Sequence, residues 1–380
     1  MPDTRLFSSP STGENRKGRT GIVVVIGPLP PPMHGMARVT ALMVERLRAH
    51  VPVRMVNTSP GFTRGGFRYH IEKMLRVIGS AAVLVGNAGR RGRRAYLPAD
   101  GGVGMLYTAL LAGLARWLGY RLFIHYHTYA HITRRNARMT LLALLAGPHA
   151  RHIVLCRTMR REFLALYPQV RRCLVVSNAI FTPPAARVAV SRDGPLVLGH
   201  LSNLCREKGL DVLFDLLRAL RAEGVAARLV LAGPGLSVAD REVIAGAIRE
   251  FGDALDYRGP LFDGDKDAFY RTIDVFVFPT RNEAQPVVVF EALAAGVPVL
   301  AWARGCLAED LGRGIWGEAV AVGADFTAVA VPRLKLWAVD RDALARAAWA
   351  SLKHARTAHI VAGAGLSRCL SLLSGTRIRF

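Results

Sequence analysis

The sequence predicts an α/β protein with two Rossmann-like domains that face each other across a cleft. At 380 residues the chain exceeds the size at which a single core usually stops growing, about 250 to 300 residues. Short β-branched runs alternate with helical patterns, which is typical of parallel sheets with crossover helices. The alternation pauses at 181–190, a Pro- and Ala-containing stretch, and then starts again.

The predicted elements divide the chain into four parts. Residues 1–20 have no apolar period and are expected to form a flexible tail. The first domain spans 21–185, the second spans 186–360, and 361–380 is expected to hold a helix that can cross back to the first domain. Strands are predicted at 22–26, 53–57, 122–126, 152–155 and 173–176, and in the second half at 196–201, 228–231, 255–258, 275–278 and 297–301.

The segment 278–300, FPTRNEAQPVVVFEALAAGVPVL, is the most informative stretch for function. A strand ends there, and Pro286 suits the start of a helix because its missing N–H would have no intrahelical partner. The free N–H groups of Val287 and Val288 favour an anion, while Glu283 and Glu291 can accept hydrogen bonds from sugar hydroxyls. This combination predicts a nucleotide sugar as ligand. The alternative is that Glu283 caps the helix and Glu291 is a solvated surface residue.

Several other loops follow predicted strands, where ligands of open parallel sheets bind. Gly35 closes the loop GPLPPPMHGM and lets the backbone approach a ligand, whereas His34 is interpreted as an ordinary loop residue. In HYHTYAHI we assign His127 to the site and His125 to the core. A metal site is the alternative interpretation, which the spacing of the histidines does not favour. The remaining loops are LSNLCREKG, LAGPG, YRGPL and DGDKD. We interpret DGDKD as a helix N-cap with solvated charged side chains.

Taken together, these motifs resemble the retaining glycosyltransferases of group 1 (family 4), which have the GT-B fold. The signature is a Glu, seven residues and a second Glu followed by Ala and a small-residue turn, as in Glu283 to Pro298. The resemblance implies that Glu283 and His127 contact the transferred sugar and that Glu291 holds the donor ribose. Further donor contacts are implied for a set from several loops: Gly35, Arg206, Lys208, Gly233, Leu261, Pro286, Val287 and Val288.

The resemblance implies transfer of a sugar from a nucleotide diphosphate donor, with retention of configuration. No metal or other cofactor is required if Lys208 and backbone dipoles neutralise the diphosphate. The sequence departs from the family pattern at Asn203, Ala284 and Gln285, so a sugar-binding relative without activity stays an alternative. Others are a nucleotide-sugar epimerase, a sugar phosphorylase, or a basic nucleic-acid-binding protein, although no nucleic-acid module is visible.

Charge is distributed unevenly along the chain. Residues 1–190 contain 28 lysines and arginines against 6 aspartates and glutamates, a net charge of +22, while residues 191–380 carry only +1. Such asymmetry predicts an anionic partner for the first half. We expect an anionic membrane surface, contacted by arginines and lysines (Arg64, Arg68, Lys73, Arg76, Arg90, Arg91, Arg93, Arg94) and by apolar neighbours (Phe62, Phe67, Met74, Leu75, Val77, Ile78). The expected acceptor is then a lipid-linked or growing polysaccharide.

Five cysteines without a CxxC pair favour a reducing compartment over disulfides or a zinc site. No apolar run reaches the roughly 18 residues that a membrane span needs, and 101–118 is interpreted as a buried helix. The chain start also lacks a signal-peptide pattern. We therefore expect a cytoplasmic protein that can lie on the inner face of the cell membrane.

Overall fold

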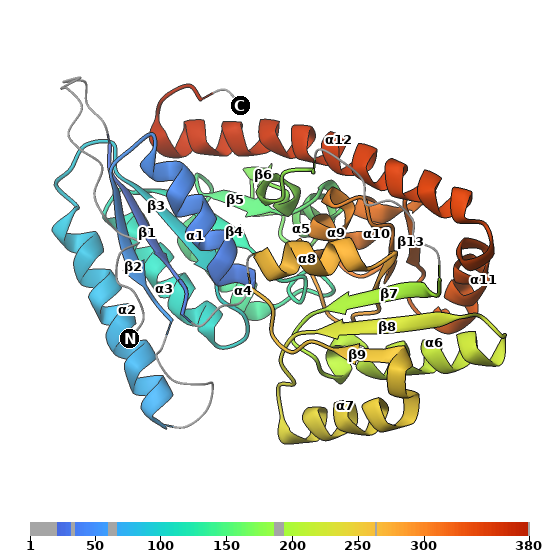
Figure 1. Ribbon diagram of the computed structural model, residues 1–380. Helices are drawn as coiled ribbons and strands as arrows, with labels where there is room; N and C mark the ends of the chain where they lie inside the picture. Colours follow the sequence, from blue (N-terminus) through green and yellow to red (C-terminus); the bar gives the residue numbers. More distant parts are fainter. Residues whose placement is uncertain (1–20, 32–34, 60–66, 186–193, 263, 379–380) are drawn as a thin grey trace.

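A computed structural model describes residues 21–31, 35–59, 67–185, 194–262 and 264–378, without the side chains of 67–70. Two parallel sheets confirm the predicted α/β class, and Figure 1 shows them in separate halves of the molecule. The first sheet has the order β2-β1-β3-β4-β5-β6. Its strands are β1 (Val23–Gly27), β2 (Val53–Asn57), β3 (Arg94–Ala99), β4 (Arg121–Tyr126), β5 (Arg151–Val154) and β6 (Cys173–Val175).

The second sheet has the order β12-β13-β11-β10-β7-β8-β9 and is parallel except for the β12–β13 pair. Its strands are β7 (Leu196–Leu201), β8 (Ala227–Ala232), β9 (Leu255–Tyr257), β10 (Val275–Phe278), β11 (Val299–Trp302), β12 (Arg313–Gly314) and β13 (Gly317–Val320). Strand prediction was therefore accurate to within a few residues, except that β3, β12 and β13 were missed.

Helices cover both faces of each sheet, which explains the long apolar runs in the strands. The longer helices of the first half are α1 (Gly35–Arg48), α2 (Phe67–Gly86), α3 (Gly104–Trp117), α4 (Ala137–Ala146) and α5 (Arg157–Leu166). The later helices are α6 (Leu210–Ala222), α7 (Val238–Phe251), α8 (Gly264–Thr272), α9 (Val287–Ala294), α10 (Leu307–Leu311), α11 (Phe326–Val339) and α12 (Arg341–Ser374). Short 3₁₀ turns are η1 (Asn178–Phe181), η2 (Arg206–Lys208) and η3 (Gly252–Ala254).

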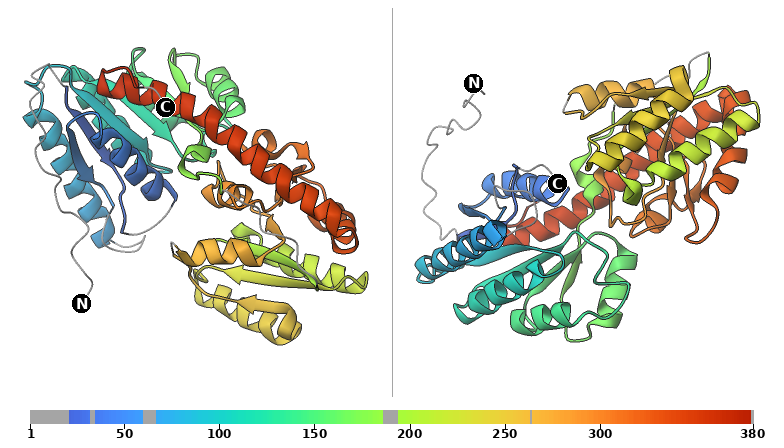
Figure 2. Two further views of the ribbon diagram at one scale, coloured as in Figure 1. Left: turned by 45° about the horizontal axis from the view of Figure 1, so that its top comes forward. Right: turned by 90° about the horizontal axis from the view of Figure 1, so that it is seen from below.

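The long helix α12 connects the two halves. Figure 2 shows it running from the second sheet to the first, where it packs against α1, β6 and η1. Its apolar residues Leu366 and Leu370 share one core cluster with Met43 of α1 and with Phe290 of α9. Burial on both halves therefore stabilises their relative position.

Helix α3 differs from its prediction. One face is buried through Met105, Leu111 and Ala112, but Leu110 and Trp117 are 62% and 81% exposed. The expected fully buried helix is thus an amphipathic surface helix.

The cysteine prediction was wrong for one pair. Cys156 and Cys306 form a disulfide between residues 150 positions apart, while Cys173, Cys205 and Cys369 are free. Sequence spacing could not show this pair because only the packing of the two halves brings it together.

Candidate functional site

A cavity of about 1630 Å³ lies between the two halves, beside the carboxyl ends of several strands. Its walls contain Gly35 and His127 from the first half, together with Lys208, Gly233, Leu261, Glu283, Pro286, Val287, Val288 and Glu291 from the second. All of the predicted site residues except Arg206 therefore lie around one space. Arg206 has an 85% exposed side chain that pairs with Asp211 at 3.5 Å, and it does not line the cavity.

Helix α9 presents Glu291 to this cavity. Pro286 is the residue before its first turn, and Glu291 lies just over one turn inside. The side chain is only 12% exposed, and it accepts hydrogen bonds from Lys266 at 2.9 Å and from Tyr270 at 3.0 Å. Arg38 of α1, in the first half, donates a third at 2.6 Å.

The charge of Glu291 follows from these contacts. Burial alone would raise the pKa of this carboxyl, but Lys266 and Arg38 together hold the pKa below its ordinary value. Glu291 is therefore ionised at neutral pH and can accept hydrogen bonds from a ligand hydroxyl. The alternative of a solvated surface glutamate does not describe this residue.

Glu283 and Lys208 form a direct ion pair at the other end of the site, and each side chain is 24% exposed. Lys208 ends the 3₁₀ turn η2, and Gly209 follows with a φ of +82°. A Cβ at Gly209 would lie 2.1 Å from the carbonyl oxygen of Pro279, so only glycine allows this approach. The close approach fixes the Lys208 loop against the loop that carries Glu283.

The histidines after β4 have different surroundings. His125 is fully buried, and its Nδ1 is 2.6 Å from the hydroxyl of Tyr96. Burial, assisted by the neighbouring His127, holds the pKa of His125 well below its usual value. The rings of His125 and His127 are 4.0 Å apart, and His127 lines the cavity. Within the described residues no cluster of three or more His, Cys, Asp or Glu side chains suits a metal ion.

Gln285 connects the site to the junction of the two halves. Its side-chain oxygen accepts from the backbone N–H of Asn178 at 2.8 Å, and its backbone oxygen accepts from the Asn178 amide at 2.7 Å. Its amide nitrogen donates to both oxygens of Asp310, at 2.9 and 3.1 Å. The departure from the family pattern at Gln285 is thus part of a buried hydrogen-bond network.

Burial raises the pKa of Asp310 to about 7, in spite of the Gln285 hydrogen bonds. Because this pKa exceeds the ordinary value of 3.8, the unfolded chain loses the proton first as the pH rises. We therefore expect the free energy of unfolding to decrease between about pH 4 and pH 7, and Asp310→Asn to remove part of this decrease. Urea unfolding of both proteins at several pH values measures it. Parallel curves for the two proteins would contradict the assignment.

The sequence interpretation missed several residues of the site. Lys266 belongs to the DGDKD motif, which was expected to be solvated charge, but it pairs with Glu291 and is 18% exposed. Arg38 follows Gly35 by one turn of α1, so the helix period predicts that both face the same space. His34 and Asp263 lie outside the described residues.

The amino-acid sequence is similar to those of known glycosyltransferases over part of its length. Residues 195–336 match the family model described as Glycosyl transferases group 1. A putative glycosyltransferase, EpsF of Bacillus subtilis, is 33% identical over 108 residues, which is 28% of this chain and 27% of that protein. The alignments with the curated relatives span between 27% and 34% of those proteins.

Solved structures match over most of the chain. Sucrose-phosphate synthase from Thermosynechococcus elongatus has a TM-score of 0.68 at 15% identity, with 92% of this chain and 99% of that chain covered. Anabaena HepE, in complex with UDP and glucose, has a TM-score of 0.64 at 17% identity, with 93% and 99% covered. The predicted fold of two Rossmann-like domains, GT-B, is thereby confirmed.

Proposed function

We propose that this chain, whose residues 195–336 match the group 1 glycosyltransferase family model, is a member of that family and transfers a sugar from a nucleotide diphosphate donor to an acceptor hydroxyl. The observation that carries the proposal is the cavity between the two halves, into which Glu283, Glu291, Lys208 and the start of α9 converge. An ionised carboxylate, a cation and a helix N-terminus in one space suit a ligand with hydroxyls and phosphates.

Each group has a distinct task in this proposal. Glu291 accepts hydrogen bonds from the ribose hydroxyls in exchange for one of its protein partners, and Glu283 and His127 contact the transferred sugar. When the bond between the anomeric carbon and the diphosphate breaks, negative charge grows on the diphosphate oxygen. Lys208 and the first N–H groups of α9 stabilise that charge, which is the main electrostatic contribution to catalysis.

The acceptor hydroxyl forms the new bond to the anomeric carbon as the bond to the diphosphate breaks, and its proton passes to the departing diphosphate oxygen. Retention of configuration is part of the proposal and comes from the family resemblance. No protein nucleophile is assigned, and we propose that no metal is needed because Lys208 and the α9 dipole supply the positive charge.

A thermal-shift panel with UDP, GDP, ADP, CMP and dTDP tests the donor class. UDP is the first nucleotide to test, because the structures of HepE and of an O-GlcNAc transferase were determined in complex with UDP. A ligand that binds only the folded state raises its stability by mass action. Stabilisation by one of these nucleotides supports the proposal, and stabilisation by none of them contradicts the donor site.

The first half carries a surface that suits a lipid-linked acceptor. Apolar side chains are exposed along three neighbouring helices: Met74, Leu75 and Ile78 on α2, Leu110 and Trp117 on α3, and Leu144 on α4. The arginines Arg90, Arg91, Arg116, Arg134, Arg135 and Arg138 are exposed close to the ends of these helices. Apolar side chains beside arginines fit a bilayer surface with anionic headgroups.

Several of the residues that were expected to contact the membrane instead form contacts within the protein. Lys73 is buried against Asp100 at 2.9 Å, and Arg76 pairs with Glu72 on its own helix. Arg94 is buried in β3, and Arg93 donates to the carbonyl of Leu118. Of the others, Phe62 and Arg64 lie outside the described residues, and the side chains of Phe67 and Arg68 are not described. Within the described chain, no helix combines the length and apolar character that a bilayer span requires.

We expect the protein to float with vesicles that contain anionic lipid, and Trp117→Ala to reduce the bound fraction. Burial of one large aromatic side chain contributes about 1.5–3 kcal/mol, so the affinity should fall by roughly tenfold or more. Trp349→Ala is the matched control, since Trp349 is 61% exposed on α12. Equal binding to neutral vesicles, or an equal effect of both substitutions, would contradict a membrane surface on α2, α3 and α4.

A further inference from the structure

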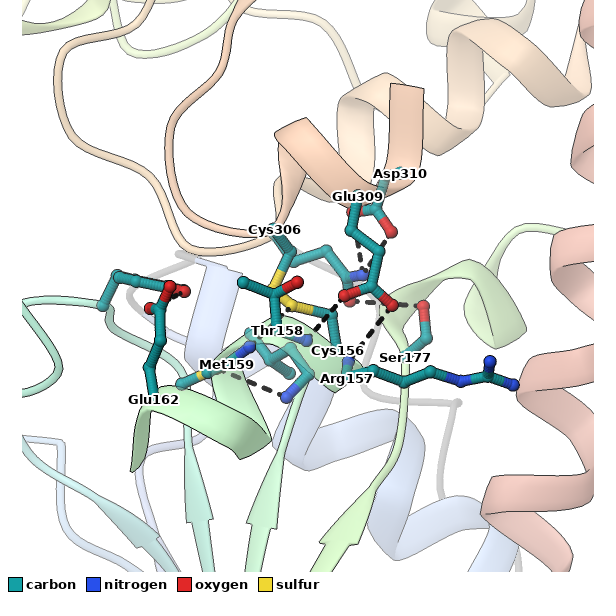
Figure 3. The surroundings of a disulfide bond; sticks show 12 residues. Cys156, Arg157, Thr158, Met159, Glu162, Ser177, Cys306, Glu309 and Asp310 are labelled. Atoms are coloured by element: carbon teal, nitrogen blue, oxygen red, sulfur yellow. Dashed lines mark hydrogen bonds between the residues drawn. A yellow bond between two sulfur atoms is a disulfide. The ribbon is translucent and has the colours of Figure 1, made fainter. Parts of the chain in front are cut away.

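The disulfide between Cys156 and Cys306 links the two halves of the molecule. Cys156 precedes the first turn of α5 in the first half, and Cys306 precedes α10 in the second. Their Cα atoms are 5.9 Å apart although 150 residues separate them in the chain. Figure 3 shows the bond between the start of α5 and the start of α10.

A second contact beside the disulfide also crosses between the halves. The carboxylate of Glu309 accepts hydrogen bonds from the backbone N–H groups of Arg157 at 3.2 Å and Thr158 at 2.7 Å (Figure 3). A negative side chain from α10 therefore caps the positive end of α5. Two short elements from different halves thus meet end to end.

The same junction also contacts the loop that carries Glu283. The N–H of Cys306 donates to the carbonyl of Ala284 at 2.7 Å. Gly305 has a φ of +57°, and a Cβ there would lie 2.3 Å from the carbonyl oxygen of Glu283. The segment that holds Cys306 is therefore packed directly behind the loop that carries Glu283 and Gln285.

Both sulfur atoms are enclosed when the halves are together. Cys156 is 3% exposed and Cys306 is fully buried. A small thiol or disulfide cannot reach either sulfur in this arrangement. Exchange therefore requires local opening of the first turn of α5 or of α10 around the pair, which the bond between the two sulfurs still permits. Because the two cysteines belong to different halves, a bond between them limits how far the halves that enclose the cavity can separate.

We propose that Cys156 and Cys306 are a reversible thiol–disulfide modification site that controls how far the two halves can separate. In the forward step, the thiolate of one cysteine attacks a low-molecular-weight disulfide such as glutathione disulfide. One glutathione thiolate leaves and takes up a proton, and a mixed disulfide forms. The second cysteine then attacks the mixed disulfide and releases the second glutathione. One protein dithiol and one glutathione disulfide thus give one protein disulfide and two glutathione thiols.

The oxidised form holds the halves together, and the reduced form lets them part. Under the proposed function, a nucleotide donor must enter and leave the cavity, so the disulfide should slow both steps. This consequence rests on the proposed function, whereas the effect of the bond on domain separation does not.

The experiment compares the full chain after treatment with glutathione disulfide and after reduction with a phosphine. Alkylation of the denatured protein followed by mass spectrometry counts the free thiols. Small-angle X-ray scattering measures the radius of gyration, and amide hydrogen exchange measures the opening of α5 and α10. We expect three alkylated cysteines after oxidation and five after reduction. We also expect a larger radius and faster exchange in the reduced form, with nucleotide dissociation about tenfold faster.

Two variants assign the effect to this pair. Cys306→Ser should have the radius and exchange rates of the reduced protein under both conditions. If this variant does not fold, the comparison of oxidised with reduced wild type still tests the bond. Cys173→Ser is the matched control, because Cys173 is a partly buried free cysteine of the first half, and this variant should keep the full redox response. Five alkylated cysteines after oxidation would overturn the proposal. A disulfide that leaves scattering and hydrogen exchange unchanged would overturn it as well. If neither form binds any nucleotide, the donor proposal fails, and the scattering and exchange data still decide the role of the disulfide.

Discussion

Glu291→Gln is expected to remove the stabilisation of the protein by its nucleotide ligand. The substitution keeps the size of the side chain but removes the charge that accepts from Arg38, Lys266 and Tyr270. Hydrogen bonds to a charged group contribute about 1.5–3 kcal/mol each. Glutamine offers the ribose a neutral acceptor and turns the second oxygen into a donor, so binding should weaken by roughly ten- to a hundredfold. Thermal shift and titration calorimetry with the nucleotide found in the panel measure the loss.

The same substitution should also destabilise the ligand-free protein. Lys266 and Arg38 would face each other's charge without their shared carboxylate, and we expect the free energy of unfolding to fall by about 1–3 kcal/mol. Urea unfolding measures this change separately from binding. A variant that is less stable but still binds the nucleotide normally would show that Glu291 has only a structural role.

Glu318→Gln is the matched control for both measurements. Glu318 lies on β13 and pairs with Arg333 at 3.4 Å, with an 18% exposed side chain, but it does not line the cavity. Its loss should change stability slightly and nucleotide binding not at all. If both substitutions weaken binding equally, the effect of Glu291 is not specific to the site.

The sequence predicted much of the fold because buried parallel strands leave a strong local signal. The ranges of β2, β7 and β10 were correct to the residue, since each contains several β-branched or apolar residues and is bounded by turn residues. Strand β3 was missed because it begins with Arg94 and contains Pro98, two residues that strand patterns disfavour. Its central position in the first sheet nevertheless buries it completely.

Residues that line the candidate site were predictable where a motif gives both residue type and position. Lys208, Glu283 and Glu291 stand at motif positions, and all three line the cavity. Arg38 and the disulfide partners Cys156 and Cys306 could not be found in this way. Their partners are 253 and 150 residues distant, so only the docking of the two halves creates these contacts.

Lys208→Met is expected to lower the turnover number by about 10²- to 10³-fold. This is the usual cost of removing one preorganised positive or hydrogen-bonding group from developing negative charge. Methionine keeps the length and apolar stem of the side chain but removes the ammonium group next to Glu283. Release of nucleoside diphosphate from the nucleotide sugar measures the rate with water as the acceptor, so the two proteins can be compared through donor hydrolysis alone.

Lys335→Met controls for the loss of a lysine elsewhere in the second half. Lys335 forms an ion pair with Glu223 at 2.8 Å on the surface, and such pairs contribute little to stability. This variant should keep the turnover number of the wild type. A turnover number within threefold of the wild type for Lys208→Met would contradict the electrostatic role of this lysine.

The ion pair between Lys208 and Glu283 makes a sharper test possible. If the two side chains act only through the substrate, the effects of Lys208→Met and Glu283→Gln on the activation free energy should add in the double variant. If each holds the other in place, either single substitution already disrupts the unit, and the double variant should be little worse than the more impaired single one. The direct contact between the two side chains favours the second result. In that case the pair, rather than either residue alone, sets the position of the sugar relative to the leaving diphosphate.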